Sequence, residues 1–210
     1  MLKVLQASQL SLHDVEDKFG LAEDTDAGFF TEWQTLPPKL DAYEQKTLDS
    51  ARLYFKHLLK YPVREEIVKM VIVSPLLAVA GFYQKPFRSV AEQSVEVEAL
   101  NNNEIVRGRI DVLAINGQVW VAAVEAKGSQ FSWSVGLPQA LVYMASSASA
   151  NQPRFGLITN GTEFIFVKLQ ASLDKYGLSK LFSLHNPGND FYSVVGVLRA
   201  ISRLQNQLNN

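Results

Sequence analysis

The pair Asn116-Gly117 lies between two runs of strand-forming residues and strongly restricts how this chain can fold. The runs are GRIDVLAI at 108–115 and QVWVAAVEAK at 118–127. Because Asn and Gly tolerate the positive φ angles of a two-residue turn, the sequence predicts a tight antiparallel hairpin here. The alternating segment SVEVEAL at 94–100 predicts another antiparallel strand before it. We therefore expect three antiparallel strands in sequence order.

Two helices are expected before these strands. Apolar residues at helical spacing predict a helix that begins near Tyr43 and is stopped by Pro62. A second helix is expected to begin near Val63, with a kink at Pro75 and an end at Gly81.

More elements are expected after the hairpin. A helix is predicted over 133–147, and a second strand pair over 154–160 and 162–169, joined at the Asn160-Gly161 turn. Helical spacing over 191–208 predicts a closing helix. The order helix, three strands, helix, two strands predicts an α/β fold in which helices flank a central mixed sheet.

The N-terminal part is expected to form a helical arm. Residues 20–40 combine Gly, Asp, Thr and a Pro-Pro pair, which disfavours regular structure and indicates a connector. We predict an N-terminal arm and helix over 1–62 and a main domain with a C-terminal helix over 63–210.

Composition narrows the possible chemistry. The chain has 210 residues, 47% of them hydrophobic, and its 20 basic and 21 acidic residues give a net charge of -1, so any DNA contact is expected to be local. With no cysteine, a metal site must use oxygen or imidazole ligands. The first residues lack the apolar core of a signal peptide, and the apolar stretch from Ile67 to Phe82 is too interrupted to span a bilayer, so we expect a cytoplasmic protein without membrane contact.

Three residues on the predicted hairpin carry potential metal chemistry. Glu125 and Lys127 are two residues apart on one strand and therefore face the same way, and the neighbouring strand can bring Asp111 beside them. Two carboxylates at one sheet end are hard oxygen ligands suited to Mg²⁺ or Mn²⁺. Alternatively, all three residues are solvated side chains on exposed strand faces. The apolar run VWVAAV before Glu125 is typical of a buried central strand and favours a site.

Four motifs in order along the chain resemble the PD-(D/E)XK nuclease superfamily. They are the helix EEIVKMVIVSPLLAVAGF at 65–82, RGRIDVLAI followed by VEAK, QALVY at 139–143, and LITNG at 157–161. Within the superfamily they are similar to the N-terminal nuclease domain of type I restriction motor subunits and its stand-alone relatives. The resemblance implies a restriction-endonuclease-like fold, with the nuclease-like domain over 63–210.

The resemblance also implies roles for individual residues. It makes Asp111 and Glu125 metal ligands, with the carbonyl of Ala126 a third, and makes Lys127 the group that orients water. Gln139 and Tyr143 match the family's Q-x-x-x-Y motif and are expected to line the same cleft, since a four-residue step returns to one helix face. A surface glutamine and a packed tyrosine are the alternative.

A helix carboxylate is also expected near the metal. We prefer Glu66 over Glu65, because its spacing to Lys69 resembles the family's Glu-x-x-Arg, although both residues also suit a helix N-terminus. Two basic residues, Arg107 and Arg109, are candidates for phosphate binding or exposed strand charges.

Other residues offer weaker signals. His13, His57 and His185 lack metal-ligand spacing, and helicase and phosphate-loop motifs are absent from the sequence. The resemblance thus implies a Mg²⁺-dependent endodeoxyribonuclease related to restriction or mobile elements, with DNA and restriction or recombination subunits as partners and a homo-oligomer as an option. The alternative is a catalytically silent nucleic-acid or protein interaction module with the same fold.

Overall fold

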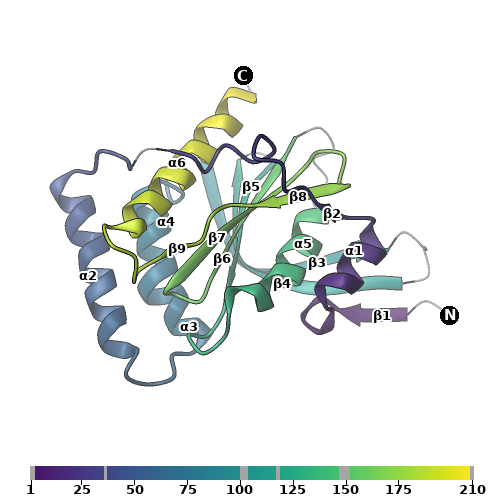
Figure 1. Ribbon diagram of the computed structural model, residues 1–210, viewed down its shortest axis with the longest axis horizontal. Helices are drawn as coiled ribbons and strands as arrows, with labels where there is room; N and C mark the ends of the chain where they lie inside the picture. Colours follow the sequence, from purple (N-terminus) through teal and green to yellow (C-terminus); the bar gives the residue numbers. More distant parts are fainter. Residues whose placement is uncertain (1–2, 36, 100–103, 117–118, 147–151, 209–210) are drawn as a thin grey trace.

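The computed structural model describes residues 3–35, 37–99, 104–116, 119–146 and 152–208. The side chains of 113, 115, 116, 119–126 and 205–208 lie outside this description. Within the described residues, a nine-stranded mixed sheet lies between two layers of helices (Figure 1). The predicted α/β fold, with helices on both faces of a central mixed sheet, is confirmed.

The strands are β1 (Lys3–Gln6), β2 (Ala22–Glu23), β3 (Phe87–Glu98), β4 (Glu104–Asn116), β5 (Val119–Ala126), β6 (Arg154–Thr159), β7 (Glu163–Leu169), β8 (Lys175–Leu178) and β9 (Phe182–Ser183). The α-helices are α1 (Leu12–Phe19), α2 (Ala42–Leu58), α3 (Glu65–Val68), α4 (Ser74–Ala80), α5 (Leu137–Ala145) and α6 (Asp190–Leu208). Short turns of other helix types are η1 (Ala7–Gln9), η2 (Lys69–Val73) and η3 (Trp133–Gly136).

The sheet is antiparallel from β3 through β4 to β5 and has a parallel step between β5 and β6. Strands β3, β4 and β5 form the predicted antiparallel series, although β3 begins earlier than expected. Strand β6 pairs parallel to β5, since α5 lies between them in the chain and provides the crossover. Strands β6 and β7 form the predicted antiparallel pair. The predicted Asn116-Gly117 turn lies partly outside the described residues.

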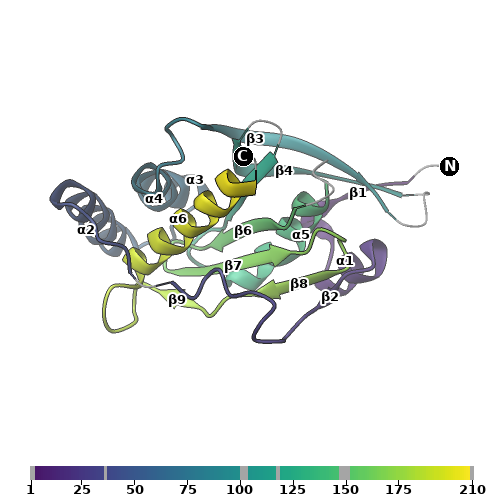
Figure 2. The same ribbon diagram turned by 90° about the horizontal axis from the view of Figure 1, so that it is seen from above.

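Helices lie on both sides of the sheet (Figure 2), and a hydrophobic core lies on each of its two faces. On β7, Phe164 and Phe166 pack in one core with α2, α4 and α6, while Ile165 and Val167 pack in the other with α1 and α5. This alternation follows from the two-residue period of a strand. Strands β6 and β7 are therefore buried on both faces.

The helix predicted to begin near Val63 contains a change of helix type. A five-residue π-helical turn, η2, separates α3 from α4. Pro75 follows this turn and has no N–H to donate to an earlier carbonyl, so the regular hydrogen-bond ladder cannot run through it. Gly81 ends the helix in the left-handed conformation with φ 93°, as expected.

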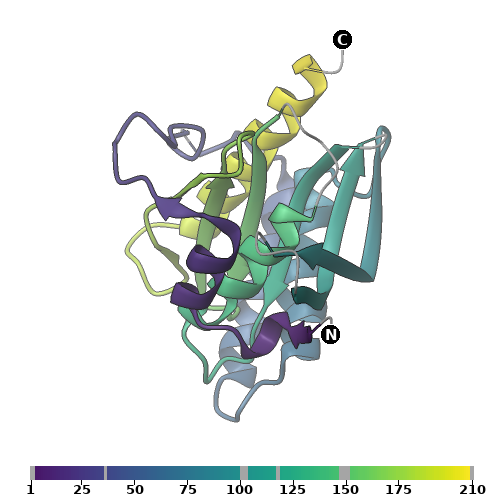
Figure 3. The same ribbon diagram turned by 90° about the vertical axis from the view of Figure 1, so that its right-hand side faces the viewer.

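The N-terminal segment joins the same sheet. Strand β1 pairs parallel to the start of β4, and β2 pairs parallel to β8. Between them, η1 and α1 pack against α5 (Figure 3). Helix α2 ends four residues before Pro62, with Leu59 as its C-cap. The predicted division at residue 62 stays a prediction, but the segment before it contributes strands to the main sheet.

Candidate active site

One edge of β4 is shared by two strands. Strand β3 pairs along β4 from Ile105 to Asn116, so β1 and β5 must use the opposite edge. On that edge β1 pairs with 104–107 and β5 pairs with 112–116. Among the described pairs, the segment 108–111 is left between them. Asp111 lies at the end of this gap, where β5 begins to pair.

Tyr143 of α5 fills the gap. Its ring is 1% exposed, and its hydroxyl accepts a hydrogen bond from the backbone N–H of Arg109 at 3.3 Å. Gly108 makes this approach possible, because a Cβ at that position would lie 2.4 Å from a ring carbon of Tyr143. The sheet and α5 are thus joined at this point by a side chain that occupies the place of a strand.

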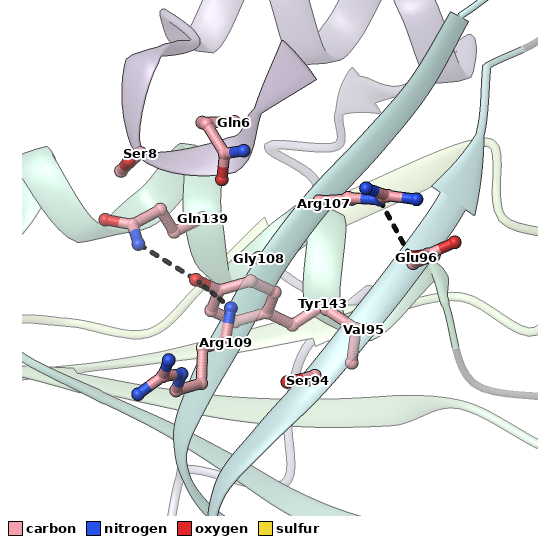
Figure 4. A pocket seen from close by; sticks show the side chains of 10 residues that line it. All are labelled: Gln6, Ser8, Ser94, Val95, Glu96, Arg107, Gly108, Arg109, Gln139 and Tyr143. Atoms are coloured by element: carbon pink, nitrogen blue, oxygen red, sulfur yellow. Dashed lines mark hydrogen bonds and ion pairs between the residues drawn. The ribbon is translucent and has the colours of Figure 1, made fainter. Parts of the chain in front are cut away.

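A hydrogen-bond relay connects Tyr143 to Lys127. The Gln139 amide nitrogen donates to the Tyr143 hydroxyl at 2.9 Å, and the Lys127 ammonium donates to the Gln139 amide oxygen at 2.7 Å. Lys127 is also held by its backbone N–H, which donates to Thr159 O at 2.8 Å. The structure therefore places Lys127, Gln139 and Tyr143 side by side, and Figure 4 shows the bond between Gln139 and Tyr143.

Asp111 lies on β4 directly beside the part of the strand that pairs with β5. It is 7% exposed and directly precedes Val112, which pairs with Val124 of β5, and Glu125 is the next residue after Val124 on that strand. The side chains of Glu125 and Ala126 lie outside the described part of the chain. The predicted closeness of the two carboxylates therefore stays a prediction.

Lys69 contacts Asp111. The sequence analysis used Lys69 only for its spacing to Glu66 and gave it no role in the site. The Lys69 ammonium lies 3.0 Å from Asp111 Oδ1, 3.1 Å from Glu92 Oε1 and 3.3 Å from Glu65 Oε1. Burial by itself would lower the pKa of Lys69, but the hydrogen bond to Asp111 and the surrounding carboxylates raise it overall. Three carboxylate groups thus surround one cation beside β4.

The geometry favours Glu65 over Glu66 as the helix carboxylate. Burial, followed by the charge of Asp111, raises the pKa of Glu65 above its usual value. Glu65 also contacts Lys69, whereas Glu66 is exposed and lies one position further round the helix. The Glu-x-x-Lys spacing suggested Glu66, but the contact uses the i,i+4 step, which brings Glu65 onto the face of Lys69.

Glu92 marks an irregularity of β3 opposite Asp111. It lies between the register pairs Ala91–Val112 and Gln93–Ile110, and its φ of 56° is unusual for a residue with a side chain. On β4, Ile110 packs in one core and Val112 against the other. The side-chain alternation therefore changes at Asp111. Glu92 carries no periodic or motif signal in the sequence, so sequence analysis could not identify it.

The Thr-Asn-Gly motif at 159–161 forms a structural turn. The Asn160 amide oxygen accepts the backbone N–H of Thr162 and of Glu163, and its nitrogen donates to Phe131 O at 3.0 Å. Gly161 has φ 89°, and a Cβ there would lie 2.2 Å from Phe55. The motif therefore holds the loop that follows β5, in addition to reversing the chain.

The remaining candidates are at the surface. Arg107 pairs with Glu96 at 2.8 Å and Arg109 pairs with Glu92 at 3.0 Å, both as exposed ion pairs. The three histidines are exposed and lie in α1, α2 and the loop after β9. None of the three histidines contributes to the site.

The residues present fit a hard divalent cation. Mg²⁺ takes one or two protein carboxylates and fills its other positions with water and phosphate oxygens. Asp111 and Glu65 supply buried or half-buried carboxylates, and Lys69 already stands among them as a cation. Among the described residues, no three His, Cys, Asp or Glu groups converge to hold a metal by themselves. A complete site thus requires Glu125 or solvent ligands.

The element order and this site define an α/β domain with a potential acidic centre where β4 meets β5.

No family model matches the chain, and no curated protein matches it. A solved fragment assigned as an HsdR subunit of a type I restriction enzyme, from Vibrio vulnificus YJ016, is similar at a TM-score of 0.40 and 21% identity, over 65% of this chain and 26% of that one. The match therefore spans about a quarter of that solved fragment, and a likeness this slight does not define a family. No helix in the described part of the chain is long and apolar enough to cross a membrane.

Proposed function

We propose that this protein is a Mg²⁺- or Mn²⁺-dependent endodeoxyribonuclease that hydrolyses DNA phosphodiester bonds. The observation that carries the proposal is the relay from Tyr143 through Gln139 to Lys127, which ends beside the junction of β4 and β5. A surface lysine needs no such support. An ammonium fixed by two buried or half-buried side chains is typical of a group whose direction matters for chemistry.

The metal ligands would be Asp111, Glu125 and the carbonyl of Ala126, with Glu65 close to Asp111. A bound divalent cation supplies polarisation of the phosphate and a lower pKa for its water. Lys127 aligns the attacking water and stabilises negative charge on the phosphate oxygens. Gln139 holds the Lys127 ammonium in place, and Tyr143 holds Gln139.

Lys69 balances charge in the metal-free protein. Asp111 is nearly buried, and a buried carboxylate without a cation is costly. The ammonium at 3.0 Å offsets that cost. A divalent cation offers Asp111 stronger compensation, which leaves Lys69 to pair with Glu65 and Glu92.

Cleavage of a supercoiled plasmid and of single-stranded circular DNA tests the proposal. We expect nicking or cutting with Mg²⁺ or Mn²⁺, none with EDTA, and loss of cleavage in Asp111→Asn and Lys127→Met. The matched controls are Asp17→Asn and Lys180→Met, which change exposed residues away from the site and are expected to cut normally. Cleavage that persists in both site variants, or its absence under every metal condition, contradicts the proposal.

A second candidate is a nucleic-acid or protein interaction module without turnover. Two observations favour it. One is the net charge of -1, and the other is the ion pair in which the Lys69 ammonium neutralises the Asp111 carboxylate. This candidate predicts DNA or protein binding that is unchanged by Asp111→Asn and no cleavage with any divalent cation.

A further inference from the structure

Two recesses meet beside Lys127. The first, of about 400 Å³, lies along β4 and is lined by Arg107 and Arg109. The second, of about 380 Å³, lies between the start of α3 and the loop after β5 and is lined by Lys127 and Phe131. Ser8 and Gln139 line both recesses. The two recesses are therefore adjacent, and we name them together the β4–Phe131 groove.

The N-terminal turn forms one wall of this groove. Figure 4 shows Gln6 and Ser8 above Gln139, with Arg107 and Arg109 further along β4. Ala7, between Gln6 and Ser8, is 1% exposed and packs in the core with α5. The wall is therefore anchored by its own buried residue and by the pairing of β1 with β4.

The loop after β5 forms the other end of the β4–Phe131 groove. Its Ser129 exchanges backbone and hydroxyl hydrogen bonds with Val63, and the carbonyl of Phe131 accepts from Asn160. The backbone is thus fixed on two sides, while the ring of Phe131 is 49% exposed. A rigid backbone that presents an exposed aromatic ring is suited to stacking against a planar ligand.

We propose that the β4–Phe131 groove binds one single strand of DNA, which deepens the proposed function by naming its substrate class. Arg107 and Arg109 contact phosphates at one end, and an unpaired base stacks on Phe131 at the other. The strand passes Ser8 and Gln139 and so brings a phosphate to Lys127. The exposed ion pairs of both arginines contribute little stability and are readily exchanged for bidentate contacts to phosphate.

Three observations favour a single strand over a duplex. Each recess is at the small end of the range for ligand pockets, and a duplex would need a broad surface instead. The net charge of -1 differs from the strongly basic balance typical of proteins that neutralise both phosphate backbones of a duplex. An exposed aromatic ring stacks with bases that are unpaired, whereas bases inside a duplex are already stacked.

Fluorescence anisotropy in EDTA tests this inference separately from cleavage. The probes are a fluorescein-labelled single strand of about ten nucleotides, the same sequence as blunt duplex, and the RNA equivalent. We expect the single DNA strand to bind at least about tenfold more tightly than the duplex, and Phe131→Ala to weaken its binding about tenfold. The matched control is Tyr83→Ala, because Tyr83 is 50% exposed and lies outside both recesses.

Salt dependence tests the phosphate contacts. Arg107→Gln is expected to reduce the slope of log K against log salt by about 0.7, the value for one phosphate contact of a single strand. Arg88→Gln, at an exposed position of β3 outside the groove, is expected to leave the slope unchanged. Ser8→Trp, which fills the junction, should abolish binding, and a thermal melt checks that this variant is folded.

The outcomes separate this inference from the proposed function. Equal or tighter binding of the duplex or the RNA, or unchanged binding in Phe131→Ala and Arg107→Gln, overturns the single-strand groove. Single-strand binding with the expected variant effects supports the groove even if no metal gives cleavage, and in that case only the nuclease proposal fails.

Discussion

Gly108→Ala is expected to damage the junction of β4 and α5. The added Cβ would lie 2.4 Å from a ring carbon of Tyr143, 3.0 Å from Ala7 Cβ and 3.1 Å from the Tyr143 hydroxyl. Since carbon atoms pack at about 3.5–4.0 Å, the ring must move by roughly 1 Å. Tyr143 is 1% exposed and packs in the core, so a shift of its ring disturbs its packing neighbours.

The expected cost follows from this overlap. Overpacking of a well-filled core costs about 1–3 kcal/mol of unfolding free energy. Displacement of the hydroxyl also weakens its bonds to the Arg109 N–H and to Gln139, and through Gln139 it loosens Lys127. We therefore expect lower stability together with a larger loss of cleavage than Arg88→Gln, a surface change, would cause.

Urea denaturation measures the effect, with Tyr143→Leu as the partner variant. In the Tyr143→Leu background the overlap is relieved, so Gly108→Ala should cost at least about 1 kcal/mol less than in the natural chain. A thermal melt should show the same order, with Gly108→Ala lower by several degrees. A penalty below about 0.5 kcal/mol, or one that is the same in both backgrounds, refutes the packing argument.

Other predictions concern the N-terminal contacts and the turn after β6. The hydrogen bond from Lys18 lowers the pKa of Glu104. The stabilisation that this ion pair gives is therefore present above about pH 4.5 and is lost as the pH falls through the lowered pKa. Thermal melts between pH 3 and 6 should show this loss in the natural chain and not in Glu104→Gln. Gly161→Ala combines a φ of 89° with an overlap with Phe55 and is expected to cost about 2–4 kcal/mol in urea denaturation. Asn160→Ala removes the bond that holds the loop after β5 and should speed amide exchange in that loop, whereas unchanged exchange would show that the bond does not restrain it.

Local features of the sequence determined much of the fold. The Asn160-Gly161 turn, the end of a helix at Gly81 and the antiparallel series β3-β4-β5 follow from residues close in the chain. Each depends on backbone conformations or on two-residue alternation, which neighbouring residues specify by themselves. The four-residue step from Gln139 to Tyr143 likewise placed both side chains on one helix face.

The tertiary structure alone decided how these pieces meet. Strands β1, β2, β8 and β9 have four residues or fewer, too short for a periodic pattern, and exist because longer neighbours offer them hydrogen bonds. The contact of Lys69 with Asp111 joins residues 42 positions apart, and no local pattern records it. Gly108 is unremarkable as a strand residue until Tyr143 packs against it. Sequence periodicity specifies which way a side chain faces, whereas the partner it meets there depends on packing between distant segments.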